Sequence, residues 1–286
     1  MRRVAVLVLF FVAACGSFGA AQPHTLSLAY KAGDTYKYKF HSTSKQTAGT
    51  GGMTIPVSVD TSANETVAVK SVDSSGVADL SITLSDFSLK TVAAGVTNTT
   101  TGLPANSVEV KIRPDGSLVS VNGNDLMAGS PIAALAGVGG GYFIAAVLPD
   151  KAVKVGDTWS KTYDQKDPIG SGTVHIVSDS KYLRDESFNG VTAAVVETKS
   201  TSTLDLSGPT QGTPGAMSGV SVKGTFTTDV MTWIDPNGHR VLKSHSTAQD
   251  DLTINLPTTS TNKSSSPVMQ GPLTAKGETT SDLAPA

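Results

Sequence analysis

A short motif occurs twice in this sequence, as KAGDTY at residues 31–36 and as KVGDTW at residues 154–159. In each copy the glycine can adopt positive φ and the aspartate can hydrogen-bond the backbone. Each copy therefore predicts a turn that leads into a β-strand. A second pair, RPDG at 113–116 and DPNG at 235–238, follows in the same order; the offsets are 123 and 122 residues. Two matches at nearly one offset indicate an internal duplication.

The segments between these motifs alternate apolar and polar residues with period two, which is typical of half-buried strands. The DPNG motif predicts a hairpin turn, because proline fixes φ and glycine accepts a left-handed conformation. Segments rich in Gly, Ser, Thr and Pro predict loops at 43–53, 205–217 and 258–267, and we expect the last residues to fray. Strands are expected near 36–40, 54–72, 77–89, 108–112, 118–121, 158–164, 172–184, 191–204, 219–234 and 239–256.

The composition favours strands and turns over helices with charged surfaces, since only 16% of residues are charged and 6% aromatic. We therefore predict one mainly β domain over residues 22–286. Its related halves would be 22–123 and 151–286, separated by an insertion at 124–150.

The N-terminus has the features of a signal peptide, predicted here as residues 1–21. Arg2 and Arg3 precede an apolar run over 4–14, which is shorter than the roughly 20 residues that span a bilayer. Residues 12–15, VAAC, are similar to a bacterial lipobox, which predicts lipid attachment at Cys15. The alternative is cleavage after Ala21. Either way we expect export to the cell envelope, on the periplasmic or outer face and lipid-anchored, or otherwise secretion.

Charge and cysteine content narrow the function. Removal of the signal leaves 20 basic and 24 acidic residues, a net charge of 20 minus 24, or −4. No clustered basic face is visible, so nucleic acid is not expected as a partner. With Cys15 as the only cysteine, the mature chain has no internal disulfide and needs a large core.

Residues 126–148 contain no charged side chain. This stretch is long enough to cross a membrane, and Gly137 and Gly141 have the spacing of packed membrane helices. Against a crossing, it would place two similar halves on opposite sides of the bilayer. The preferred prediction is two short helices, near 124–136 and 141–148, that lie against the sheet and cover apolar surface.

Strands, a central apolar insertion, further strands and a lipobox together resemble the lipoprotein-localisation carriers and LppX-type envelope lipoproteins. The resemblance implies a strongly curved antiparallel sheet, a half-barrel of about 10–12 strands, with helices on its concave face around a cavity for acyl chains. The GDT-aromatic openings and Leu148-Pro149 also resemble an uncharacterised family of exported bacterial proteins, which implies no function.

Apolar side chains of the central segment would line such a cavity and bind a hydrophobic or lipid ligand. The alternative is a dry, filled core. The candidate cavity residues are Leu126, Met127, Ile132, Leu135, Tyr142, Phe143, Ile144, Val147 and Leu148.

Motifs for catalysis or metal binding are weak. Asp34-Thr35 and Asp157-Thr158 lack the glycine that aspartic proteases place after Asp-Thr. The Ser-x-x-Lys matches at 42–45 and 178–181 fall in predicted strands, where positions i and i+3 face opposite sides. The five histidines are scattered. We predict no catalytic residue, metal or cofactor, and a non-enzymatic carrier; the alternative is a structural or protein-binding envelope module whose partner is unknown.

Overall fold

A computed structural model describes residues 23–50, 53–102, 105–123, 146–166, 173–207, 221–255 and 272–286. Within these ranges the regular secondary structure is entirely β, and no helix is present. The strands are β1 (Thr35–Thr50), β2 (Met53–Val72), β3 (Ala78–Ala93), β4 (Val96–Thr101), β5 (Asn106–Ile112), β6 (Leu118–Gly123), β7 (Thr158–Lys166), β8 (Thr173–Phe188), β9 (Val191–Ser207), β10 (Ser221–Asp235), β11 (Arg240–Asn255) and β12 (Leu273–Pro285).

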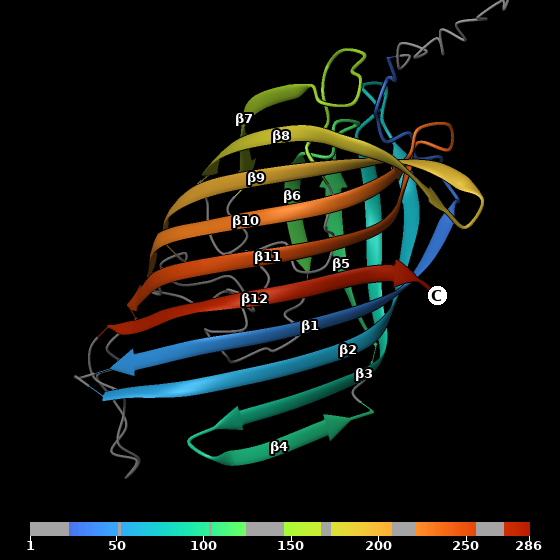
Figure 1. Cartoon of the computed structure of the whole chain (residues 1–286). Coiled ribbons are helices and arrows are strands. Elements are labelled where there is room, and N and C mark those ends of the chain that lie inside the picture. The colour runs from blue at the N-terminus through green and yellow to red at the C-terminus, as the bar shows by residue number, and fades with distance from the viewer. Residues whose placement is uncertain are drawn as a thin grey trace, which may run out of the picture.

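All twelve strands belong to one antiparallel sheet, in the order β6-β5-β3-β2-β1-β12-β11-β10-β9-β8-β7, with β4 paired to β3 outside this path. The sheet curls into a nearly closed barrel, so that β5 and β6 lie behind the wall formed by β10 to β12 (Figure 1). The mainly β class, the antiparallel pairing and the predicted strand number are confirmed.

The half-barrel prediction is wrong, because the curvature continues until β7 approaches β6. A largely buried lysine connects the two sides of this seam. Lys161 of β7 places its Nζ 2.8 Å from Asp115 Oδ2, in the β5–β6 turn, and 2.6 Å from Asp150 Oδ1. Burial alone would raise the pKa of Asp115, but hydrogen bonds from Lys161 and Ser117 outweigh it and lower that pKa.

The helical insertion is not found in the described residues. Residues 124–145 lie outside them, and residues 146–149, part of which was predicted as the second helix, have no regular secondary structure. They pass through the inside of the barrel, where Ala146 and Leu148 belong to the core. The predicted placement against the concave face therefore holds for these residues, and their predicted helical conformation is wrong.

The two copies of the opening motif form the same turn. Gly33 N donates to Val69 O, and Gly156 N donates to Tyr182 O; φ is 92° at Gly33 and 96° at Gly156. Only glycine adopts such angles without strain. The predicted turn at each motif is confirmed. The predicted DPNG hairpin is also confirmed, since it joins β10 to β11.

Two segments predicted as irregular are strands. Residues 43–50 extend β1, so the predicted loop at 43–53 is wrong. The C-terminal residues do not fray: they form β12, which pairs with β1 from Tyr38 to Gly49 and with β11 from Ser244 to Ile254. β12 therefore joins β1 to β11 and makes one sheet of the two predicted halves (Figure 1).

Apolar side chains fill the turn end of the barrel, the end that carries the KAGDTY, KVGDTW, RPDG and DPNG turns. The N-terminal segment closes this end: Leu26 and Leu28 are buried, and His24 forms a β-bridge with Val153. A second apolar cluster lies at the opposite end, which we call the loop end, around Ile254 and Leu204. The strands β1, β7, β9 and β11 run toward this end and finish there.

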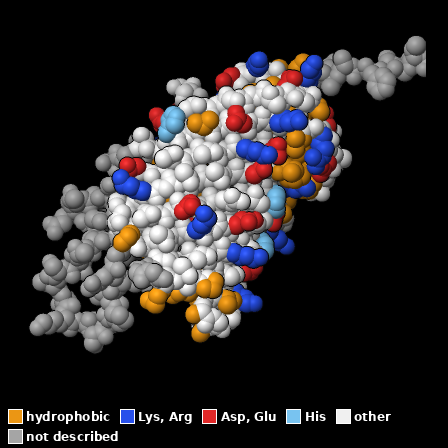
Figure 2. Space-filling model, turned by 60° about the vertical axis from the view of Figure 1, so that its left-hand side comes forward, with side chains coloured by type: hydrophobic (Ala, Val, Ile, Leu, Met, Phe, Trp, Pro, Cys, Tyr) orange, Lys and Arg blue, Asp and Glu red, His pale blue; other side chains and the backbone are white. Residues whose placement is uncertain are grey.

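The outer wall carries charges of both signs. Figure 2 shows acidic and basic side chains interspersed on one face, among uncharged polar groups. Ion pairs such as Lys276–Asp251, at 3.0 Å, join neighbouring strands on this exposed side. Exposed pairs of this kind contribute little to stability.

A chain that ends at Pro272 should fail to fold, because it loses the backbone ladders on both sides of β12 and exposes two long strand edges. We expect a loss of cooperative thermal unfolding by circular dichroism and aggregation on size-exclusion chromatography. A chain that lacks only Ala286 is the control. A truncated monomer that melts at the parent temperature would contradict this role of β12.

Candidate functional site: the inner wall of the barrel

Inward side chains change character along each long strand. In β8 the buried inward positions are Val174, Ile176, Ser178, Ser180 and Tyr182, read from the loop end to the turn end. The wall is thus apolar at both ends and hydroxyl-bearing between them.

The same change occurs in the strands that follow β8 around the barrel, and the registers align the polar positions. These inward serines and threonines form a band, interrupted by Val230 of β10 and Ala248 of β11, which we call the hydroxyl belt. Its members are Ser178, Ser180, Thr198, Ser200, Ser202, Thr228, Thr232, Ser244, Ser246, Thr279, Ser281, Ser42 and Ser44.

Most of the belt is satisfied by hydroxyl pairs between adjacent strands. This pairing reduces the cost of placing polar groups away from water, which is high for an unpaired hydroxyl. The pairs are Ser42–Ser281 at 2.9 Å, Ser44–Thr279 at 2.9 Å, Ser178–Ser200 at 2.8 Å and Ser180–Thr198 at 2.8 Å.

One pair of the belt binds a main chain inside the barrel. Ser180 Oγ donates to Val147 O at 3.0 Å, and Val147 N donates to Thr198 Oγ1 at 3.2 Å. Because Ser180 has only one hydroxyl hydrogen, Thr198 donates in the bond between the two hydroxyls. Trp159 Nε1 also donates to Val147 O, at 2.9 Å. The belt can therefore bind groups that carry both a donor and an acceptor.

Three inward polar side chains are buried without a hydrogen-bond partner among the described residues. Thr232 and Ser244, which face each other on β10 and β11, are 0% and 3% exposed. Glu65 is 1% exposed, and neither carboxyl oxygen has a partner. Unpartnered buried polar groups are uncommon and mark strain or a binding function.

Glu65 lies on the inner face of β2, where the register places it between Tyr38 and Leu84. Burial raises the pKa of Glu65 from its ordinary 4.5 to about 8. The carboxyl group is therefore mostly protonated and neutral at pH 7. Burial, followed by the nearby Glu65, also raises the pKa of Tyr38, whose hydroxyl donates to Val241 O at 2.8 Å.

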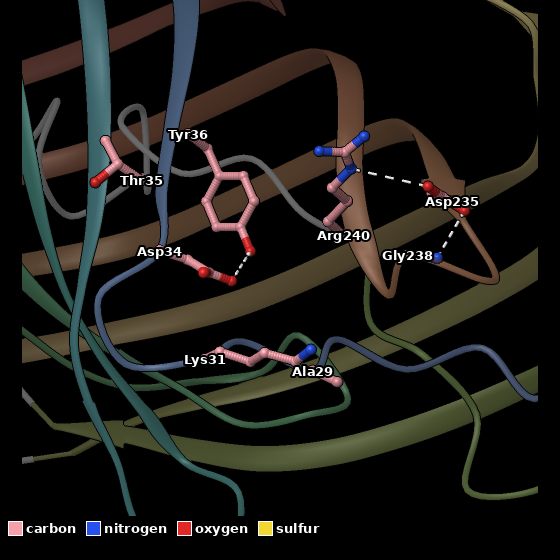
Figure 3. A pocket seen from close by; sticks show the side chains of 8 residues that line it. All are labelled: Ala29, Lys31, Asp34, Thr35, Tyr36, Asp235, Gly238 and Arg240. Carbon is pink, nitrogen blue, oxygen red and sulfur yellow. Dashed lines mark hydrogen bonds and ion pairs between the residues drawn. The ribbon is translucent and has the colours of Figure 1, made fainter.

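A separate pocket of about 360 Å³ lies at the turn end (Figure 3). Several of its polar groups are engaged in local contacts. Tyr36 donates to Asp34 at 3.1 Å, and the backbone nitrogens of Asn237 and Gly238 donate to Asp235. We therefore assign these groups to turn stabilisation. The lining residues are Ala29, Lys31, Asp34, Thr35, Tyr36, Asp235, Gly238 and Arg240.

Of the predicted site residues, only Val147 and Leu148 are described. Both are buried inside the barrel, with 3% and 0% exposure, and Leu148 packs in the core of the turn end. The lipid-attachment residue Cys15 lies outside the described residues, and so do Leu126, Met127, Ile132, Leu135, Tyr142, Phe143 and Ile144. Their roles stay predictions.

Sequence reasoning missed the hydroxyl belt and Glu65. The signal was present in β8, where two serines occupy the inward positions between Ile176 and Tyr182. The alternation with period two identifies the inward residues of a single strand. Whether the hydroxyls of neighbouring strands lie side by side depends on the register between the strands.

The weak catalytic and metal motifs gain no support in the described part of the chain. Ser42 and Ser178 face inward, whereas Lys45 and Lys181 are exposed, as expected for positions i and i+3 of a strand. Asp34 and Asp157 lie in separate turns. Among the described residues there is no cluster of His, Cys, Asp and Glu suited to a metal ion, and no helix long and apolar enough to cross a membrane.

No family model and no curated protein match this chain. Among solved structures it is similar to one concerned with lipid–protein interactions in lipovitellin, at 10% identity and a TM-score of 0.43. The match covers 90% of this chain and 26% of that chain, so this chain spans about a quarter of lipovitellin. The class defined by fold and site is an all-β, twelve-stranded, nearly closed barrel with a polar band inside. The resemblance to lipoprotein-localisation proteins stays a prediction.

Replacement of Glu65 by Gln should remove a pH dependence of stability. Because the pKa is raised from 4.5 to about 8, the folded state retains a proton that the unfolded state releases. The free energy of unfolding should then fall as pH rises through this window, by about 1.4 kcal/mol per pH unit. Chemical denaturation at acid, neutral and alkaline pH tests this. The free energy of unfolding of Glu65→Gln should not fall in this way, whereas that of the exposed Glu109→Gln control should fall as in the parent. Equal pH profiles for the parent and Glu65→Gln would contradict the prediction.

Proposed function

We propose that this protein binds an amphipathic, lipid-like ligand inside its barrel, as a non-enzymatic component of the cell envelope. One observation carries the proposal: the inner wall is apolar at both ends and hydroxyl-bearing between them. A ligand with apolar and polar parts complements such a wall, whereas a wholly apolar ligand leaves the belt without new partners.

The size of the barrel supports the same proposal. Side chains fill the interior of a barrel of about eight strands, and interiors widen as strands are added. Here the sheet has twelve strands, and the middle of its inner wall carries small serine and threonine side chains. From the strand number and the small side chains we expect room at the level of the belt for other groups.

The predicted signal peptide and lipobox support a place in the envelope, with Cys15 as the membrane anchor. A lipid anchor would hold the barrel near a source of amphipathic ligands. Transfer of such ligands between membranes is compatible with this arrangement.

Leucines inside the belt should displace the ligand. The variant Ser42→Leu/Ser281→Leu replaces two inward hydroxyls that bond each other. We expect the parent, purified from membranes, to show a bound amphipathic molecule by native mass spectrometry and solvent extraction, and the variant to lose most of it. A thermal melt checks that the variant folds.

The matched control is Thr43→Leu/Thr280→Leu, which changes the next residue on β1 and the preceding one on β12, and therefore the outer face of the same two strands. This control should keep its ligand. A parent protein that carries no ligand, and takes up none from mixed lipid extracts, would overturn the proposed function.

Cys15→Ser should release the protein from the membrane fraction if Cys15 is lipidated. The expected result is a shift to the soluble fraction together with loss of labelled fatty acid. The variant Gly16→Ala keeps the cysteine and a small neighbour, and serves as the comparison. An unlipidated parent, or an unchanged distribution of Cys15→Ser, would contradict the anchor.

The second candidate is a protein-binding envelope module, favoured by β4. Of the described strands, β4 pairs with β3 alone, and all six of its side chains are exposed, Val96 by 60%. A free strand edge can pair with an extended segment of another protein. A crosslinked partner that is lost in Thr99→Pro and retained in Ser42→Leu/Ser281→Leu would favour this candidate over ligand binding.

A further inference from the structure

The loop-end border of the hydroxyl belt contains a polar cluster that spans three strands. Gln46 of β1 donates through Nε2 to Asp250 Oδ1 of β11 at 2.8 Å and to Ser44 Oγ at 3.2 Å. Thr279 of β12 also donates to Ser44 Oγ, at 2.9 Å. We call these four residues the Gln46–Asp250 cluster.

A glycine makes this bridge across β12 possible. In the register, Gly277 lies between Gln46 and Asp250, so the two side chains meet over its Cα. A Cβ at Gly277 would come within 2.4 Å of Gln46 Oε1 and of Lys45 O. Any larger residue would push Gln46 away from Asp250. The site is therefore built by three adjacent strands and does not depend on one side chain alone.

The cluster keeps unused hydrogen-bonding capacity. Both amide hydrogens of Gln46 are used, whereas its Oε1 is buried and has no partner in the part of the chain that the structure describes. Ser44 Oγ accepts two hydrogen bonds, so its own hydrogen is free to donate. Among the described residues, Asp250 Oδ2 accepts no hydrogen bond. Two acceptors and one donor are thus available close together.

Charge narrows the ligand class. At the inward positions of β8 to β12 and β1, between the apolar bands, Asp250 is the only charged residue, and no lysine or arginine is present. An anionic head group would meet the carboxylate without a compensating cation. Hydroxyl groups donate and accept at once, and so match both the cluster and the adjacent belt.

We propose that the Gln46–Asp250 cluster binds the head group of the ligand and that this head group is uncharged and rich in hydroxyls, as in a sugar. The proposal rests on the proposed function and specifies its ligand. Adjacent hydroxyls of the head group donate to Gln46 Oε1 and Asp250 Oδ2 and accept from Ser44. The apolar tail lies along the inward residues of the loop end, such as Leu252 and Ala275.

Probes with one dodecyl tail and different head groups test the proposal on the full-length protein. The probes are dodecyl maltoside, laurate and dodecyltrimethylammonium, each below its critical micelle concentration, in equilibrium dialysis. Dodecyl maltoside should bind at least about tenfold more tightly than the other two, which corresponds to roughly 1.4 kcal/mol.

Two variants locate the preference. Gln46→Leu and Asp250→Asn should each weaken dodecyl maltoside binding by about tenfold. Laurate binding should change by less than about twofold in Gln46→Leu and should not weaken in Asp250→Asn, because that variant removes the carboxylate that an anion would meet. Asp251→Asn is the matched control, since this neighbour lies on the outer face and pairs with Lys276. It should change neither affinity. Thermal melts confirm that each variant is folded, and the two cluster variants check each other.

The outcomes separate this proposal from the proposed function. Equal affinities for the three probes, or a preference for the cation or the anion, would overturn the head-group site while binding inside the barrel stands. An unchanged preference in both cluster variants would place the head group elsewhere and also overturn the site. No binding of any probe would overturn the proposed function itself.

Discussion

The barrel depends on backbone pairing between the two ends of the chain. β12, the last strand, lies between β1, the first, and β11, and its ladders extend along most of its length on both sides. Without it, the described strands would form two separate meanders with long free edges. These contacts are distant in sequence, so their formation must overcome the loop-closure entropy of nearly the whole chain. The interior exists only once this pairing is made.

Closure also sets what the interior can contain. The interior of a closed sheet widens as strands are added, and the belt places hydroxyls that need partners on its inner face. The wall meets this need in two ways that the structure shows: hydroxyls pair across strands, and Ser180 and Thr198 bind the main chain of Val147. Among the described residues, Glu65, Thr232 and Ser244 are buried and have neither a hydroxyl partner nor a main-chain partner. The proposed ligand supplies a third solution at the Gln46–Asp250 cluster, where, among the described residues, Gln46 Oε1 is also buried without a partner.

Local patterns allowed prediction of the strands and turns. Gly33, Gly156 and the DPNG turn need special backbone conformations, and these are visible in the residues themselves. β12 was missed because its inward positions include Gly277, Thr279 and Ser281, which resemble a loop in isolation. Its conformation is decided by two partner strands far away in sequence. For the same reason the belt could not be predicted: each strand contributes only a few hydroxyls, and only the register assembles them.

The two predicted halves share more than their turns. A β-bulge lies between Val69 and Ser71, where β2 pairs with β3, and another between Tyr182 and Arg184, where β8 pairs with β9. Both follow the residue whose carbonyl accepts from the glycine of the repeated motif. The duplication remains a prediction, but these shared bulges give an alignment of the two halves.

Counting back from the bulges places Glu65 at the position of Ser178, and its cross-strand neighbour Leu84 at the position of Ser200. One half thus has a hydroxyl pair where the other has a carboxyl beside an apolar side chain. The backbone that supports both is the same, so the difference lies in side chains alone. If the halves have a common origin, Glu65 occupies a position that belongs to the belt in the other half. The residue opposite it, Leu84, is apolar and cannot pair with it. Divergence of the two halves then explains why Glu65 has no polar partner. Its polar character is explained by its place in the inner band that carries hydroxyls in the other half.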